Sequence, residues 1–139
     1  MRVLAVDYGP RRTGLAVSDE TGLIARPLPA LAGGGRERLL SALAAAAREH
    51  SPVEVLLGLP RRLGGGEGTL EPEIRALAVE LEAALGLPVV LRDERLTTVE
   101  ARERLAEAGL KGKRMRAKLD SAAAAVILQE YLDEKRRKS

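Results

Sequence analysis

The order of short apolar runs constrains the fold of this chain more than any other feature of its sequence. The first three runs are separated only by turns, and they predict β-strands at residues 3–6, 15–17 and 23–28. The first turn, residues 9–14, contains two glycines and a proline, so the first two strands are expected to form a hairpin. Pro27 and Pro29 predict that the third strand ends there, near a sheet edge.

Helical and strand patterns alternate in the middle of the chain. Apolar residues at helical spacing predict helices at residues 36–49 and about 72–85, and apolar runs predict strands at residues 53–59 and 89–91. An antiparallel meander joined to right-handed parallel crossovers is then expected. The fold class is therefore α/β, with a five-stranded mixed sheet flanked by helices.

Two further helices are expected after the fifth strand. Thr97 and Glu100 have the capping-box spacing, which predicts a helix that Gly109 stops. A last helix is expected to open at Asp120 and to present one apolar face, and the tail from Lys135 to Ser139 is expected to fray. The residues between, Lys111 to Lys118, are interpreted as a basic connector.

The length of the chain bounds its organisation. At 139 residues, without an internal repeat, the chain is expected to form a single domain over residues 1–139. Its N-terminal apolar run reaches Asp7 at once and is too short for a signal peptide or a membrane span, so a cytoplasmic location is expected.

Composition excludes several kinds of site. There are no cysteines and one histidine, His50, so thiolate chemistry, cysteine zinc sites and histidine clusters are ruled out. Two tyrosines are the only aromatic residues, which argues against a platform for stacking bases. The net charge of +3 mildly favours a polyanionic partner.

Three acidic positions stand out because of where the predicted elements place them. Asp7 ends an apolar strand, Asp93 and Glu94 end the fifth strand, and Asp120 shares the apolar stripe of the last helix. Each also has a structural interpretation. Asp7 could cap its turn, the Asp93–Glu94 pair could bind a neighbouring arginine, and Asp120 could be a helix N-cap.

Convergence of these acids would create a metal site. If the last helix packs over the sheet near the ends of strands one and five, three carboxylates meet, and such oxygen ligands suit Mg²⁺ or Mn²⁺. Two metals so held can activate water and stabilise the leaving oxygen of a phosphodiester. Strand parity admits only one of Asp93 and Glu94 to a given face, and the sequence alone leaves that choice open.

Basic residues adjoin each acidic position in the sequence. Lysine and arginine contacts to phosphates supply most of the sequence-independent affinity for nucleic acid. The candidates for nucleic-acid binding are Arg11, Arg12, Arg61, Arg62, Lys111, Lys113, Arg114, Arg116 and Lys118. The C-terminal run from Lys135 to Lys138 is interpreted instead as solvated surface charge.

Five ordered motifs carry a family likeness that spans Arg2 to Leu132. They are Asp7-Tyr8-Gly9, Gly14-Leu15-Ala16-Val17-Ser18-Asp19, Gly58-Leu59-Pro60, Asp93-Glu94-Arg95-Leu96-Thr97-Thr98 and Asp120-Ser121-Ala122-Ala123-Ala124. Together they resemble the YqgF/RuvX family of pre-16S ribosomal RNA nucleases and Holliday junction resolvase-like proteins.

The resemblance implies a ribonuclease H-like fold and a nuclease that trims the 5′ end of pre-16S ribosomal RNA. It implies that Asp7, Glu94 and Asp120 are both the catalytic and the metal-binding residues, with Mg²⁺ or Mn²⁺ as cofactor. It also places Glu94 rather than Asp93 in the site. The expected partners are the RNA and a ribosomal precursor particle, and no association with a membrane is expected. The protein is expected to be a monomer or a homodimer.

Other functions remain open at the level of sequence. The leading alternative is a structure-selective nuclease for four-way DNA junctions, which would use the same metal chemistry with two sites related by a two-fold axis. The turn at residues 7–14 also resembles the phosphate loop of actin-like sugar kinases, but 139 residues leave no room for their second domain. A catalytically silent RNA-binding module is the fourth possibility.

Overall fold

A computed structural model describes residues 1–9, 11–59, 71–93 and 113–138 of this chain. For residues 113–120 it describes the course of the backbone. The expected helix from Thr97 to Gly109 lies outside the described residues.

A five-stranded mixed sheet forms the centre of the molecule, as the sequence predicts. Its strands are β1 (Val3–Asp7), β2 (Arg12–Ser18), β3 (Ala25–Ala32), β4 (Glu54–Leu59) and β5 (Val89–Asp93). The order across the sheet is β3-β2-β1-β4-β5. β1–β2 and β2–β3 pair antiparallel, whereas β1–β4 and β4–β5 pair parallel. The C-terminal ends of β1, β4 and β5 therefore lie at the same end of the sheet.

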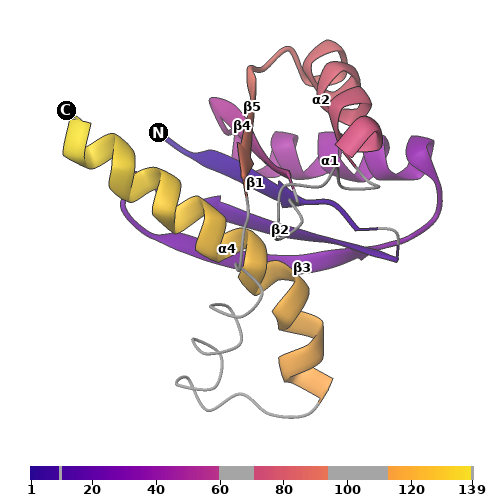
Figure 1. Ribbon diagram of the computed structural model, residues 1–139, viewed down its shortest axis with the longest axis horizontal. Helices are drawn as coiled ribbons and strands as arrows, with labels where there is room; N and C mark the ends of the chain where they lie inside the picture. Colours follow the sequence, from indigo (N-terminus) through magenta and orange to yellow (C-terminus); the bar gives the residue numbers. More distant parts are fainter. Residues whose placement is uncertain (10, 60–70, 94–112, 139) are drawn as a thin grey trace.

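Helices cover both faces of the sheet, and Figure 1 shows α1 and α2 together on one side and α4 along the other. Their bounds are α1 (Arg36–His50), α2 (Glu71–Leu85) and α4 (Lys113–Lys138). Because each strand alternates its side chains, each face has its own apolar cluster. The cluster under α1 and α2 includes Val6, Leu15, Leu43, Val55, Leu57, Ile74, Leu77 and Leu81. The cluster under α4 includes Val3, Ala5, Ala16, Leu56, Ala124, Ile127, Leu128 and Leu132.

Small side chains allow α4 to lie close to the sheet. Ala5 of β1, Ala16 of β2 and Ala124 of α4 are all essentially inaccessible to solvent and belong to one cluster. Interiors are packed to crystal-like density, so replacing any of these methyl groups by a larger side chain would push α4 outward. No described helix has the length and apolar character needed to cross a membrane.

The third strand is longer than the prolines predicted. β3 continues through Pro27 and Pro29 to Ala32, so the expectation that it ends at these residues is wrong. β3 lies at the edge of the sheet, where a missing N–H on the open side costs no ladder bond. Its register against β2 shifts between Thr13 and Leu15, a local irregularity that accommodates the strand.

The last helix begins earlier and ends later than the sequence predicted. α4 starts at Lys113, so most of the expected connector is helical and Asp120 lies inside the helix rather than at its N-cap. The helix also continues to Lys138 instead of fraying from Lys135. The long basic segment carries no glycine or proline after Gly112, so helix propensity extends it in both directions.

Arg92 joins the edge strand β5 to α4. Its guanidinium donates two hydrogen bonds to the Glu134 carboxylate, at 2.8 and 2.7 Å, and lies 3.7 Å from a carboxylate oxygen of Glu130. The hydrogen bond from Arg92 lowers the pKa of Glu134 below its ordinary value. Such a two-pronged contact fixes geometry as well as charge.

This pair predicts a pH-dependent contribution to stability. Because the folded-state pKa of Glu134 is lowered, the contribution is present at neutral pH and is lost as the pH falls through that lowered pKa. Glu134→Gln is therefore expected to melt at a lower temperature than wild type at pH 7, with the difference shrinking under acidic conditions. Glu130→Gln, which alters the longer contact to the same guanidinium, should have a smaller effect. Thermal melts from pH 3 to 7 test this, and a difference independent of pH would contradict it.

Candidate active site

Asp7 lies at the C-terminal end of the central strand, on the face that α4 covers. Val3 and Ala5 of β1 belong to the cluster under α4, whereas Val6 belongs to the cluster on the opposite face. Alternation along β1 therefore puts the odd-numbered Asp7 on the α4 face. Asp7 is half-buried and pairs with Gly14 of β2. A carboxylate in this position lies at the C-terminal end of the strand and faces α4.

The same alternation in β5 separates Asp93 from Asp7. Val90 packs under α4, and Arg92 reaches α4, while Val89 and Leu91 pack on the α1 and α2 face. Asp93 shares the parity of Val89 and Leu91 and is exposed. The structure thus excludes Asp93 from the face of Asp7. The next residue, Glu94, lies outside the described residues.

A buried serine fixes α4 beside the end of β1. The backbone N–H of Leu15 donates a hydrogen bond of 3.3 Å to the Ser121 hydroxyl, and Ser121 is 1% exposed. Leu15 pairs with Val6, the residue before Asp7. The helix backbone at residues 120 and 121 therefore lies next to the strand end that carries Asp7. The side chain of Asp120 itself is outside the described part of the chain.

Ser121 is a positioning residue that the sequence reasoning missed. A lone serine in an alanine-rich helix gives no signal of its own, because its importance depends on which backbone group it meets. The contact falls where the register between β2 and β3 shifts, so the hydroxyl serves an N–H group at an irregular point of the ladder.

Of the three candidate metal ligands, Asp7 is the one whose side chain the structure describes. Asp7 offers carboxylate oxygens on a half-buried strand end, which are ligands that Mg²⁺ and Mn²⁺ accept. Within the described ranges, no three histidine, cysteine, aspartate or glutamate side chains lie close enough to share an ion. The other two candidate ligands, Glu94 and Asp120, are the ones whose side chains fall outside those ranges.

The predicted basic residues fall into three groups. Arg11 and Arg12 are exposed in the turn that follows Asp7 and at the start of β2. The backbone of Lys113, Arg114, Arg116 and Lys118 lies in the first turns of α4, which project beyond the sheet (orange in Figure 1). Arg61, Arg62 and Lys111 lie outside the described residues.

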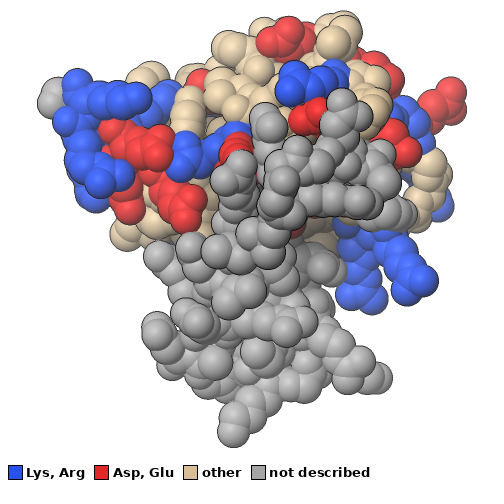
Figure 2. Space-filling model, in the orientation of Figure 1, with Lys and Arg blue, Asp and Glu red and all other residues tan. Residues whose placement is uncertain are grey.

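The opposite end of α4 carries compensated charge. Lys135 contacts Glu54, and Arg136 contacts Asp133 at 3.1 Å. Figure 2 shows basic and acidic side chains interspersed at this end of the molecule. These ion pairs favour the interpretation of the C-terminal run as surface charge.

The turn between Asp7 and β2 requires glycine at position 9. A Cβ atom built there would lie 2.6 Å from the backbone carbonyl oxygen of Arg12. Backbone cannot move aside as a flexible side chain can, so Gly9→Ala is expected to destabilise the protein by about 1–3 kcal/mol. Gly34→Ala is the matched control, because the added Cβ there would meet the movable side chain of Arg38. Urea unfolding of both variants tests this, and equal losses would contradict it.

The sheet order and the carboxylate at the end of the central strand define a class of protein, the α/β domains with a ribonuclease H-like fold. Solved structures of this class align along almost the whole chain. RuvC of Thermus thermophilus in complex with a Holliday junction substrate has a TM-score of 0.62 and 18% identity, covering 98% of this chain and 96% of that one. The Fowlpox virus resolvase with Holliday junction DNA has a TM-score of 0.62 and 12% identity, covering 97% and 99%. At these identities the similarity establishes the fold.

The family is established by sequence. The RuvX family model, described as Holliday junction resolvase, matches residues 1–134. A protein of Anaeromyxobacter sp. (strain Fw109-5) named "Putative pre-16S rRNA nuclease" is 44% identical over 133 residues, covering 96% of this chain and 97% of its own length. A Streptomyces avermitilis protein of the same name is 43% identical over 136 residues, covering 97% and 87%. The chain therefore belongs to the RuvX family, a family of nucleases.

Proposed function

We propose that this protein is a metal-dependent endonuclease that processes the 5′ end of pre-16S ribosomal RNA. The observation that carries the proposal is the placement of Asp7 at the end of β1 on the α4 face, with the Ser121 hydroxyl holding the helix beside that strand end. The relatives that share 43–44% identity carry the name of that activity.

Asp7, Glu94 and Asp120 are the proposed ligands for Mg²⁺ or Mn²⁺. For the acidic pair after β5, Glu94 is proposed because the alternative, Asp93, ends the strand on the opposite face. Helical register supports Asp120, which stands one turn before the buried Ala124 on α4. When bound, the metal would activate a water and stabilise negative charge on the phosphate being cut.

Basic residues near this site are proposed to hold the nucleic-acid backbone. The exposed Arg11 and Arg12 come four and five residues after Asp7, and the first turns of α4 carry four more basic residues in the segment before Asp120. Such contacts fix the position of a strand without reading its sequence. This suits an enzyme whose cleavage position is set by the overall shape of its substrate. Such a substrate could be a ribosomal precursor particle.

Cleavage of four-way DNA junctions is the second candidate function. It is favoured by the description of the family model and by the fold shared with RuvC and the Fowlpox virus resolvase. Symmetric cleavage of a junction needs two active sites related by a two-fold axis, so this function would require a homodimer.

The two candidates are separated by one experiment. Labelled pre-16S RNA and a synthetic four-way DNA junction are incubated with wild type, Asp7→Asn and Asp93→Asn, in Mg²⁺, Mn²⁺ or EDTA. Metal-dependent cutting of the RNA that Asp7→Asn loses and Asp93→Asn keeps is the expected result. Asp93 is the matched control because it ends β5 on the opposite face.

Other outcomes of this experiment count against the proposal. Cutting of the junction alone would favour the resolvase function, and sedimentation should then show a dimer. Binding of RNA without cutting in any metal would favour the RNA-binding module. Equal losses in both aspartate variants would contradict the assignment of Asp7 and Asp93 to different faces.

A further inference from the structure

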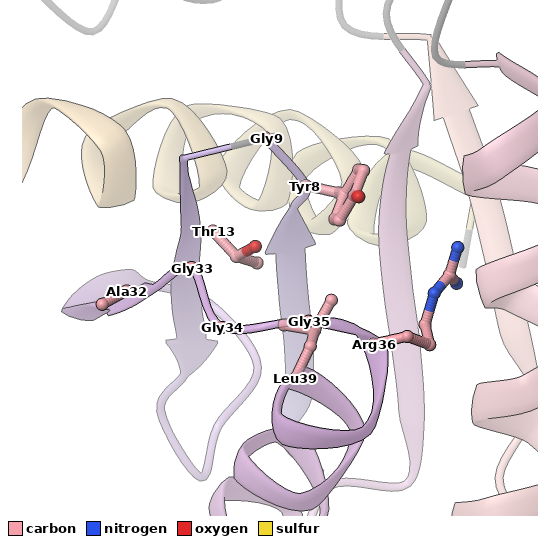
Figure 3. A pocket seen from close by; sticks show the side chains of 9 residues that line it. All are labelled: Tyr8, Gly9, Thr13, Ala32, Gly33, Gly34, Gly35, Arg36 and Leu39. Carbon is pink, nitrogen blue, oxygen red and sulfur yellow. The ribbon is translucent and has the colours of Figure 1, made fainter.

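A pocket of about 200 Å³ lies on the other side of the strand end that carries Asp7. It is enclosed by the turn after β1, the glycines at 33–35 and the first turn of α1, and Figure 3 shows these segments around it. Tyr8 lines it from the face of β1 that packs under α1 and α2. Since Asp7 and Tyr8 are neighbours on opposite faces, the pocket and the proposed active site meet at one sheet edge.

A threonine hydroxyl points into this pocket. Thr13 of β2 is 3% exposed as a whole residue, and it lines the pocket. Figure 3 shows the hydroxyl directed toward the space beside Tyr8. A hydroxyl that lines a pocket can donate a hydrogen bond to an acceptor atom of a ligand bound there.

The start of α1 adds further donors at the same place. Its N-cap, Gly35, has φ 94° and makes no side-chain capping bond. The first-turn N–H groups therefore have no cap from the N-cap side chain, and the helix dipole favours a negative group there. Gly34, Gly35 and Arg36 all line the pocket, so this end of the helix opens into it.

Arg36 supplies a cation whose hydrogen-bonding capacity is only partly used. Its Nη1 atom is buried without a hydrogen-bond partner in the described residues, and the nearest carboxylate, Glu80, is 3.8 Å away. Its Nη2 atom donates a long bond of 3.4 Å to the Glu73 backbone carbonyl. The Glu73 carboxylate accepts a hydrogen bond of 3.1 Å from the Tyr8 hydroxyl.

We propose that this pocket, the Thr13 pocket, binds a phosphate group of the nucleic-acid strand whose neighbouring phosphodiester is cut at Asp7. The inference rests on the proposed function. Threonine hydroxyls, helix N-terminal amides and an arginine are the groups that hold phosphates in proteins. A strand that crosses the sheet edge would present one phosphate to each face.

Binding measurements without cleavage test this subsite. Fluorescence anisotropy in EDTA measures the Kd of a labelled pre-16S RNA fragment for wild type, Thr13→Val, Thr13→Ser, Arg36→Gln and Arg75→Gln. Valine keeps the shape of threonine without the hydroxyl, and serine restores the hydroxyl. Arg75 is a matched control on the exposed surface of α2, paired with Glu71. Melting temperatures of all variants identify any that fail to fold.

Thr13→Val and Arg36→Gln are each expected to weaken RNA binding about tenfold, as for the loss of a hydrogen bond to a charged group. Thr13→Ser and Arg75→Gln should bind like wild type. A second arm adds inorganic phosphate at millimolar concentration. If phosphate raises the melting temperature of wild type and not of Thr13→Val while RNA affinity is unchanged in both, the pocket takes the free ion, and the strand assignment is overturned.

The remaining outcomes separate this inference from the proposed function. Wild-type cutting of RNA, together with unchanged Kd in folded Thr13→Val and Arg36→Gln, would overturn the subsite alone. Failure of wild type to bind RNA at all would overturn both.

Discussion

Replacing Asp7 by asparagine is expected to reduce metal-dependent cleavage by at least about a hundredfold, because a metal in such a site contributes several kcal/mol to stabilising the transition state. The substitution keeps the shape of the side chain and removes its charge. The half-buried strand end would then lose a ligand without losing its packing. Initial rates with labelled RNA at saturating Mn²⁺ measure the change, with Asp93→Asn as the control. A loss below threefold would remove Asp7 from the chemistry.

The same substitution should change stability in the opposite direction. Converging carboxylates repel one another in the absence of metal, so Asp7→Asn is expected to melt at a higher temperature than wild type in EDTA. Mg²⁺ or Mn²⁺ should raise the melting temperature of wild type and leave that of the variant unchanged. Melting curves of wild type and of Asp7→Asn, each in EDTA and in metal, give both the difference in stability and the response to metal. An equal metal response in wild type and variant would exclude a shared metal site at Asp7.

Truncation of Leu77 is expected to have the largest effect on stability. Leu77 lies on α2, is completely buried and belongs to the cluster that holds α1 and α2 on the sheet. Leu77→Ala removes buried methyl groups and leaves a cavity, with an expected cost of about 2–5 kcal/mol. For a chain of this size that lowers the melting temperature by roughly 10 °C.

Val79 provides the control within the same helix. It is 70% exposed, so Val79→Ala loses little buried surface and gains a better helix former. The variant should therefore be neutral or slightly more stable. Urea unfolding of the two variants measures the contrast. Similar losses in both would mean that α2 does not pack on the sheet through Leu77.

Local patterns in the sequence were sufficient to predict the sheet. The apolar runs predicted all five strands, because strand formation here depends on short runs of branched and aliphatic residues between turns. The ends of elements were predicted less well. Pro27 and Pro29 correctly predicted an edge position for the third strand, but β3 continues through both prolines to Ala32, because an edge strand can lack an N–H on its open side.

The interpretation of Asp120 as an N-cap was also wrong for a non-local reason. An aspartate before an apolar helical stripe is a common helix start, so the sequence supported it. α4 instead begins at Lys113, where basic residues with good helix propensity extend it beyond the sheet. Asp120 is therefore not the N-cap of α4.

The sequence by itself determined the fold class, the family and the acids worth testing, because each depends on residue type and order along the chain. The tertiary structure alone decided that Asp7 faces α4 and Asp93 does not, since strand parity has no meaning until each face is covered. It alone brought Ser121 to Leu15 and left the Thr13 hydroxyl facing a pocket. Such contacts join residues that are distant in the chain, and no local pattern encodes them.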